Sequence, residues 1–436
     1  MAFKIYLTLL FSFTLHCLNA QGEINNKPRA YYFSSNGNDS NMGNRISPYK
    51  TFSKIKNLEL KDGDSLIFRA KELFYGTLLL ENIKAKILIT SYGKGRAIFN
   101  GEYKEAISLK NCANIKLENL NLVGNGRKEG NTTNGLELVN SLNIIVNKLT
   151  IRGFQKVGLY IFSSQMVDID NCIAESNGSA GIMVDGENKK SSKNIVIKNS
   201  KAYNNPGDPT NFTNHSGNGI LAGFCTKVLI DHCEAYNNGW DMPRKGNGPV
   251  GIWTYESDSV VIQNCISHHN KTSEGGIDGG GFDLDGGVTN STIQNCNSYE
   301  NEGAGYGIYQ YDGASKWSNN KIIYCSSYND GLKTSGKAAI YIWNSSQDEK
   351  QFKNLLFKNN TIINRNNVVI NFDILSKHES FSFIGNEFIG KDSLIVFKQL
   401  NKKDKFLSNT WTSLKNGVLN VDKILYESII QSAIDK

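Results

Sequence analysis

Apolar and polar residues alternate with a period of two in seven short segments of the chain. The segments are GIMVD from Gly181, GILAG from Gly219, GIWTY from Gly251, GFDLD from Gly281, GIYQY from Gly307, AIYIW from Ala339 and VINFD from Val369. Their second and fourth residues are nearly all apolar, which is typical of β-strands with one buried face. Because the pattern recurs along the chain, it predicts a solenoid whose strands stack in a parallel sheet.

A second repeat lies between these segments, where a small residue is followed five positions later by an amide or acid. The pairs are Cys172 with Asn177, Ser200 with Asn205, Cys233 with Asn238, Cys265 with Asn270, Cys296 with Asn301, and Cys325 with Asp330. A ring stands three residues after each small residue from Ser200 on: Tyr203, Tyr236, His268, Tyr299 and Tyr328. Two repeats in one register predict about a dozen coils joined by short turns.

Over roughly residues 75–400 this double repeat resembles the right-handed parallel β-helix of the pectate-lyase-like superfamily. The opening segment YYFSSNGNDSNMGNRISPYKTFSKI is similar to the start of many secreted bacterial β-helix proteins. The resemblance implies an all-β, right-handed parallel β-helix with short N- and C-terminal capping elements, in a carbohydrate-processing setting. It names no reaction, because the superfamily hosts lyases, hydrolases, epimerases and tailspikes.

The chain of 436 residues divides into a leader and one solenoid unit. Lys4 precedes an apolar run from Ile5 to Leu15, which predicts a signal peptide over 1–20 that is cleaved after Ala20. We therefore expect a secreted or periplasmic protein. The expected divisions are 1–20 for the signal peptide, 21–100 for the N-terminal cap and first coils, 101–400 for the β-helix with its binding face, and 401–436 for the C-terminal cap.

Both ends of the solenoid need covers, because an open end exposes core and unpaired strand edges. Ser47 and Pro48 predict the start of a short helix that turns three apolar residues inward, namely Phe52, Ile55 and Leu58. At the other end five apolar residues with roughly helical spacing predict a second cap: Ile424, Leu425, Ile429, Ile430 and Ile434.

The eight cysteines do not have the pattern of a disulfide framework or a zinc site. Five of them recur at one coil position, which predicts a stack of small buried side chains with free thiols. The net charge of +7 is mild and spread along the chain, so we expect no nucleic-acid partner. No segment after the leader is long and apolar enough to predict a membrane span.

The coils grow longer from residue 204 onwards, mainly at the corner before the repeated strand. Loops added at one corner of successive coils predict a wall along one sheet, where binding residues concentrate. Aromatic faces suit sugar rings, so we expect a polysaccharide or oligosaccharide to bind along the outward positions of these strands. The repeat also predicts that the strands GFDLD and GIYQY pair residue by residue, with Asp283 beside Tyr309. The predicted substrate-binding residues are Asp185, Trp253, Tyr255, Tyr309, Gln310, Tyr311, Tyr341 and Trp343, with His215 from a wall loop.

The segment GGIDGGGFDLDGG from Gly275 holds the densest chemistry. Asp283 and Asp285 are two residues apart on a strand, so both carboxylates project to the same side. Two acids at this spacing can divide glycoside cleavage, one as acid and the other as base or nucleophile. The leading prediction is a polysaccharide-degrading glycoside hydrolase that needs no cofactor.

Two alternatives stay open. In the first, Asp278, Asp283 and Asp285 bind Ca²⁺ in a polysaccharide lyase or epimerase acting on uronate glycans, with Lys333 as the candidate base. This interpretation follows the Ca²⁺-dependent lyases of the superfamily, in which a Lys or Arg removes the proton next to the uronate carboxyl group. In the second, the protein binds glycans without chemistry.

Overall fold

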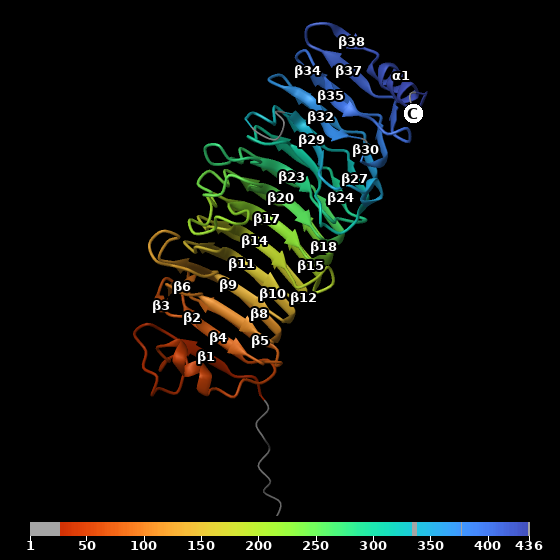
Figure 1. Cartoon of the computed structure of the whole chain (residues 1–436). Helices are drawn as coiled ribbons and strands as arrows, with labels where there is room; N and C mark the ends of the chain where they lie inside the picture. Colours follow the sequence, from red (N-terminus) through yellow and green to blue (C-terminus); the bar gives the residue numbers. More distant parts are fainter. Residues whose placement is uncertain (1–26, 334–337, 376, 435–436) are drawn as a thin grey trace, which may run out of the picture.

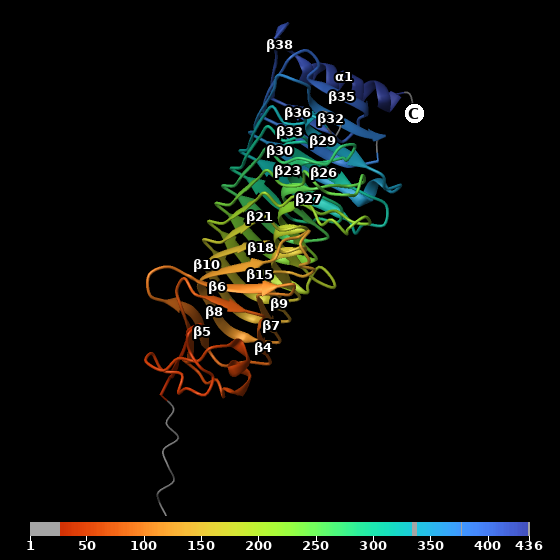
Figure 2. The same ribbon diagram turned by 90° about the vertical axis from the view of Figure 1, so that its left-hand side faces the viewer.

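The protein is a single parallel β-helix, as the sequence predicts. The computed structural model describes residues 27–333, 338–375 and 377–434. Its strands stack along one long axis, with the N-terminal coils at one end and the C-terminal helix at the other (Figure 1). The view turned by 90° shows the same column from its side, with coil above coil along the whole length (Figure 2).

One face of the column is a parallel sheet of twelve strands within the described residues. In order they are β4 (Leu78–Glu81), β7 (Ile107–Lys110), β9 (Leu136–Val139), β11 (Val157–Phe162), β14 (Ala180–Asp185), β17 (Asn218–Gly223), β20 (Val250–Tyr255), β23 (Gly280–Leu284), β26 (Tyr306–Gln310), β29 (Ala338–Asn344), β32 (Val368–Leu375) and β35 (Ile395–Gln399). We call this face the front sheet. It contains all seven segments that the alternating pattern identifies.

The remaining strands form two further faces, which are joined into one sheet because β8 and β10 bend across both. The first face contains β1 (Ala30–Phe33), β2 (Ser65–Arg69), β5 (Ile87–Tyr92), β8 (Ala113–Gly124), β10 (Leu142–Arg152), β12 (Gln165–Asp170), β15 (Ser192–Lys198), β18 (Cys225–Asp231), β21 (Asp258–Gln263), β24 (Thr292–Gln294), β27 (Trp317–Ile323), β30 (Phe352–Lys358), β33 (Glu379–Ile384) and β36 (Lys405–Leu407). The second contains β3 (Leu73–Tyr75), β6 (Ala97–Glu102), β13 (Ile173–Glu175), β16 (Lys201–Tyr203), β19 (Glu234–Tyr236), β22 (Ile266–His268), β25 (Asn297–Tyr299), β28 (Ser326–Tyr328), β31 (Thr361–Asn364), β34 (Glu387–Gly390) and β37 (Thr410–Ser413). The hairpin partner of β37 is the antiparallel β38 (Gly417–Leu419).

The interior contains stacks of like residues, one from each coil. The amide stack runs from Asn177 to Asp330, and each residue accepts the backbone N–H of the coil before it, as Asn205 does from Asn177 at 3.0 Å. These side chains are completely buried, so the stack satisfies turn amides that water cannot reach. The seven cysteines in the described residues are buried and free, as the sequence predicts; Cys17 lies outside them.

Both ends are capped, with differences from the prediction. The N-terminal element is a 3₁₀ helix, η1 (Phe52–Asn57), which buries Phe52 and Ile55 but begins after the predicted start at Ser47. A second 3₁₀ turn, η3 (Glu349–Gln351), precedes β30. At the C-terminus α1 (Val421–Ile434) covers the last coil (Figure 1).

Helix α1 buries a narrower stripe than expected. Val421, Leu425 and Ile429 are buried, whereas Ile424 and Ile430 face solvent. The side chain of Ile434 and the predicted signal peptide over 1–20 lie outside the described part of the chain. Within that part, no helix has the length and apolar character needed to cross a membrane.

Candidate active site

A pocket of about 460 Å³ opens on the front sheet over β20, β23, β26 and β29. Its lining consists of Arg244, Asn247, Gly248, Val250, Trp253, Ile277, Asp278, Asp283, Asp285, Tyr309, Tyr311, Tyr341 and Trp343. The strands supply the aromatic rings and two carboxylates. The long turns before β20 and β23 supply the rest, so the wall predicted from coil length is one side of this pocket.

Asp283 lies on β23 in the middle of the pocket floor. Its side chain is 3% exposed, and its Oδ1 atom has no hydrogen-bond partner among the described residues. Burial, with help from the charges of Asp285 and Asp278, raises the pKa of Asp283 well above its usual range. The surroundings therefore favour the neutral, protonated form of this carboxyl group.

Asp285 follows β23 and is less enclosed. Its backbone N–H donates to the carbonyl of Thr254 at 3.0 Å, and its Oδ1 accepts the N–H of Gly286 at 2.6 Å. Burial, with the charges of Asp278 and Glu256, raises its pKa to about 7. The charged form of Asp285 contributes to the high pKa of Asp283, so Asp285 loses its proton first as pH rises.

Asp278 reaches the pocket from the turn before β23. It has a left-handed backbone, with φ of 64°, and its Oδ2 accepts the N–H of Gly248 at 2.6 Å. This bond joins the turn before β23 to the turn before β20. The carboxylate therefore helps shape the pocket and adds negative charge beside the two strand carboxyls.

Asp278, Asp283 and Asp285 are the residues that would hold Ca²⁺ under the lyase alternative, which stays a prediction. In residues 27–333, 338–375 and 377–434, no group of three or more His, Cys, Asp or Glu side chains is placed to hold a metal. Asp278 and Asp285 each accept a backbone N–H with one carboxylate oxygen.

Trp253 is held rigidly at the edge of the pocket. Its indole N–H donates to Oδ1 of Asn218 at 2.9 Å, and the same oxygen accepts the N–H of Val250. The ring of His215 packs against Trp253 at 4.8 Å, and a nitrogen of His215 lies 3.1 Å from Nδ2 of Asn218. Burial, with the nearby charge of Arg244, lowers the pKa of His215 to about 4, so this imidazole is neutral at pH 7.

The register around Asp283 differs from the expected alignment of GFDLD with GIYQY. Asp283 pairs with Gly307 and not with Tyr309, and Gly307 pairs in turn with Tyr341. The short turn before β26 shifts this strand by two residues, which preserves the outward side but changes the neighbours. A Cβ atom at Gly307 would lie 2.7 Å from the ring of Tyr309, so glycine allows that ring to fold back over the strand.

Comparison with protein families gives a match to the right-handed β-helix region over residues 80–209 and 208–362. The two matches together span more than half of the chain. The chain belongs to this family. Comparison with curated proteins finds no match.

Solved structures share the fold of this β-helix protein at low sequence identity. A GH136 lacto-N-biosidase from Eubacterium ramulus is 16% identical, with a TM-score of 0.59 over 88% of this chain and 68% of the other. The mannuronan C-5 epimerase AlgE6 A-module from Azotobacter vinelandii is 14% identical, with a TM-score of 0.60 over 80% of this chain and 90% of the other. The Dettilon tailspike protein is 14% identical, with a TM-score of 0.57 over 79% and 64%.

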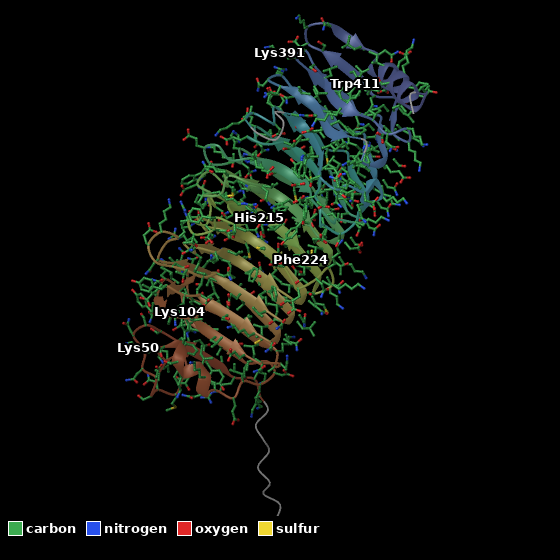
Figure 3. All side chains as sticks on the ribbon, in the orientation of Figure 1. Lys50, Lys104, His215, Phe224, Lys391 and Trp411 are labelled. Atoms are coloured by element: carbon green, nitrogen blue, oxygen red, sulfur yellow. The ribbon has the colours of Figure 1, made fainter. Side chains whose placement is uncertain are left out.

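Five of the predicted site residues of the β-helix protein do not line the pocket. Asp185 ends β14, nearer the N-terminus than the pocket, whereas Tyr255 ends β20 and stacks on Trp253 outside the lining. His215, labelled in Figure 3, precedes β17 in the chain and packs its ring against Trp253. Gln310 is fully buried, and its amide bonds Gly287, Ser315 and Gln351, so it supports the turn after Asp285 and is not available to sugar hydroxyls. Lys333 pairs with Glu302 at 3.5 Å and is not among the residues that line the pocket.

The sequence prediction missed several lining residues: Asn247, Gly248, Val250 and Ile277. The sequence signal for these residues was the extra length of the turns before β20 and β23. That length predicted the position of the wall, but it did not identify which side chains would face the pocket.

Proposed function

We propose that this β-helix protein is a secreted glycoside hydrolase that cleaves an oligosaccharide or polysaccharide in the pocket around Asp283. The observation that carries the proposal is one buried carboxyl group with a strongly raised pKa beside a second carboxyl group that ionises more readily. Such a pair provides the acid and the base or nucleophile of glycoside cleavage.

In the proposed reaction the Asp283 carboxyl gives its proton to the glycosidic oxygen. The bond between that oxygen and the anomeric carbon breaks, and positive charge develops on the sugar ring. The Asp285 carboxylate then either attacks the anomeric carbon or removes a proton from a water that attacks it. The Gly286 N–H holds the Asp285 carboxylate in place, and Asp285 is ionised above a pH of about 7.

The rest of the pocket suits a carbohydrate. Trp253, Tyr309, Tyr341 and Trp343 offer flat apolar faces that pack against the C–H faces of sugars. The volume of about 460 Å³ and the enclosing turns favour a short stretch of glycan. The names of two structural neighbours, a lacto-N-biosidase and a mannuronan C-5 epimerase, support a carbohydrate substrate.

The first experiment is a time course of the purified mature protein on neutral and uronate oligosaccharides and polysaccharides. Reducing ends and the ultraviolet absorbance of a new C=C bond are followed together. We expect reducing ends without absorbance, and we expect Asp283→Asn to abolish them. Absorbance that rises with the reducing ends and depends on added Ca²⁺ would replace this proposal with the lyase alternative. Glycan binding with no products would favour the non-catalytic alternative.

A further inference from the structure

The second face of the joined sheet contains a pair of histidines where the other coils have tyrosine followed by asparagine or glutamate. The equivalent pairs are Tyr203-Asn204, Tyr236-Asn237, Tyr299-Glu300 and Tyr328-Asn329, whereas the coil of β22 has His268-His269. His269 has φ of 53°, the left-handed conformation that the asparagines also adopt. This turn brings two consecutive side chains together outside the β-helix, on a different sheet from the pocket.

The ring of His268 is fixed by stacking. It lies between the rings of Tyr236 and Tyr299, at centroid distances of 5.0 and 4.5 Å and interplanar angles of 4° and 5°. The side chain is 14% exposed, and that of His269 is 48% exposed. One nitrogen-bearing ring is thus held in place, while the other stands at the surface.

The outer nitrogens of both rings face carboxylates. Nε2 of His268 lies 3.3 Å from Glu234, and Nε2 of His269 lies 2.9 Å from Glu300. Lys201 binds the other oxygen of Glu234 at 2.6 Å, which leaves Oε1 for the histidine. Because an ionised carboxylate only accepts hydrogen bonds, the contact with Glu234 favours the tautomer of His268 that is protonated at Nε2, and the charge of Glu300 favours the same tautomer of His269.

In these tautomers the inner nitrogens face one another with their lone pairs. The two Nδ1 atoms are 2.8 Å apart. Two lone pairs at this distance repel unless a cation lies between them, either a shared proton or a metal ion. A carboxylate behind each imidazole is also the usual support for metal-ligating histidine, because it fixes the tautomer and makes the ring a better donor.

The separation indicates which metal geometry fits. With metal–nitrogen bonds of about 2.0 Å, ligands at a right angle are about 2.9 Å apart, whereas ligands at a tetrahedral angle are about 3.3 Å apart. The observed 2.8 Å matches the right angle. Tetragonal coordination by imidazole is the preference of Cu²⁺ and Ni²⁺, and Cu²⁺ binds nitrogen ligands more tightly.

We propose that His268 and His269 form a two-nitrogen surface site for a tetragonal divalent cation, Cu²⁺ above all, with water completing the coordination. The site is independent of the proposed glycan chemistry. It depends on the Nδ1 atoms facing each other and on the two supporting glutamates.

The test is Cu²⁺ titration of the untagged protein, followed by calorimetry and by electron paramagnetic resonance. We expect one site per chain with two nitrogen ligands. His269→Asn and His268→Tyr each restore the residue found in neighbouring coils, so both variants keep the backbone and the ring stack. Each should weaken Cu²⁺ binding at least tenfold and remove one nitrogen from the spectrum.

The matched control is His232→Asn. His232 is also a surface histidine with a left-handed backbone, and its Nδ1 lies 2.9 Å from Asp231, but no second imidazole faces it. This variant should bind Cu²⁺ as the wild type does. Equal binding by wild type and His269→Asn, or no Cu²⁺ binding by the wild type, would overturn the proposal; the second result would leave a shared proton between the rings.

Discussion

Three coils of the front sheet carry an aspartate at the same register position, namely Asp185, Asp285 and Asp373, and of these only Asp285 lines the pocket. Asp185 and Asp285 make the closest comparison, because each is followed by a glycine. This column of positions follows the register from Val184 through Thr254 to Leu284, so that Asp185 and Asp285 are equivalent positions three coils apart. Each Oδ1 accepts the N–H of the following glycine, at 2.8 Å for Asp185 and 2.6 Å for Asp285. Burial is the main cause of a raised pKa in both.

The surroundings of the two aspartates differ. The residue two positions earlier is Met183 in one coil and Asp283 in the other, so only Asp285 has a carboxyl neighbour on its strand. The hydroxyl of Tyr160 donates to Asp185 at 3.1 Å. This register position on the front sheet is therefore enough to bury a carboxyl group. A reactive site additionally needs a second acid on the same strand and the longer turns that enclose the pocket.

The largest expected effect separates these two aspartates by activity. Asp285→Asn should lower kcat of glycoside cleavage by about 10²–10⁴-fold, because the base or nucleophile is lost. Asp185→Asn should leave kcat within about threefold. Rates are measured by reducing ends on the substrate found in the first screen. Equal losses in the two variants would show that the column, and not the pocket, carries the effect.

A second prediction concerns stability. Asp285 binds its proton up to a pH of about 7 in the folded state but only up to about 3.8 when unfolded. The folded state therefore holds more protons between these values, and the free energy of unfolding falls as pH rises through this window. Asp285→Asn removes this loss and should stabilise the protein above pH 7 by on the order of 2–4 kcal/mol.

The measurement is urea unfolding of both proteins at pH 4 and pH 8. The advantage of the variant should appear at pH 8 and shrink at pH 4. Asp312→Asn, at an exposed turn residue of the same face, should change neither value. A variant that is no more stable than the wild type at pH 8 would contradict the raised pKa of Asp285.

The stacking of the coils could be predicted from the sequence because each coil repeats the same physical requirement. Ile182, Ile252 and Ile340 fill the interior at one position, and the amides from Asn177 to Asn301 satisfy the same buried turn. Because of this repetition, the fold can be predicted from a single sequence. The carboxylates of the pocket were also found, since period two alone puts Asp283 and Asp285 on one side.

The pocket lining was harder to predict because it depends on turns that do not repeat. The contact between Asp278 and the Gly248 N–H joins two irregular turns, and no periodic pattern specifies it. The two-residue shift of register at Gly307 was not predicted for the same reason. A shift by two residues leaves every outward residue outward and every inward residue inward, so the alternating pattern does not reveal it. Gln310 was misplaced because Ser315 and Gln351 approach it only through turn geometry.

A third, smaller effect compares aromatic residues in the same column. Trp343 lines the pocket and pairs with Tyr309, whereas Phe162 pairs with Asp185 outside it. Trp343→Ala should weaken glycan binding about tenfold, equivalent to ~1.4 kcal/mol, through lost contact with a sugar ring. Phe162→Ala should leave the dissociation constant unchanged. Binding is measured by calorimetry with Asp283→Asn as the background, so that no substrate is consumed.

The smallest expected effect tests why Asp185 does not contribute to the proposed catalysis. Tyr160→Phe removes the side-chain hydroxyl that donates to the Asp185 carboxylate and lowers its pKa. The pKa of Asp185 should therefore rise further, and the protein should lose about 1 kcal/mol of unfolding free energy at pH 8 through the lost hydrogen bond. The carboxyl carbon signal of Asp185 in nuclear magnetic resonance reports the first change, and urea unfolding reports the second. Activity should stay within twofold of the wild type, because raising the pKa of a lone carboxyl does not provide the second acid that Asp283 supplies to Asp285.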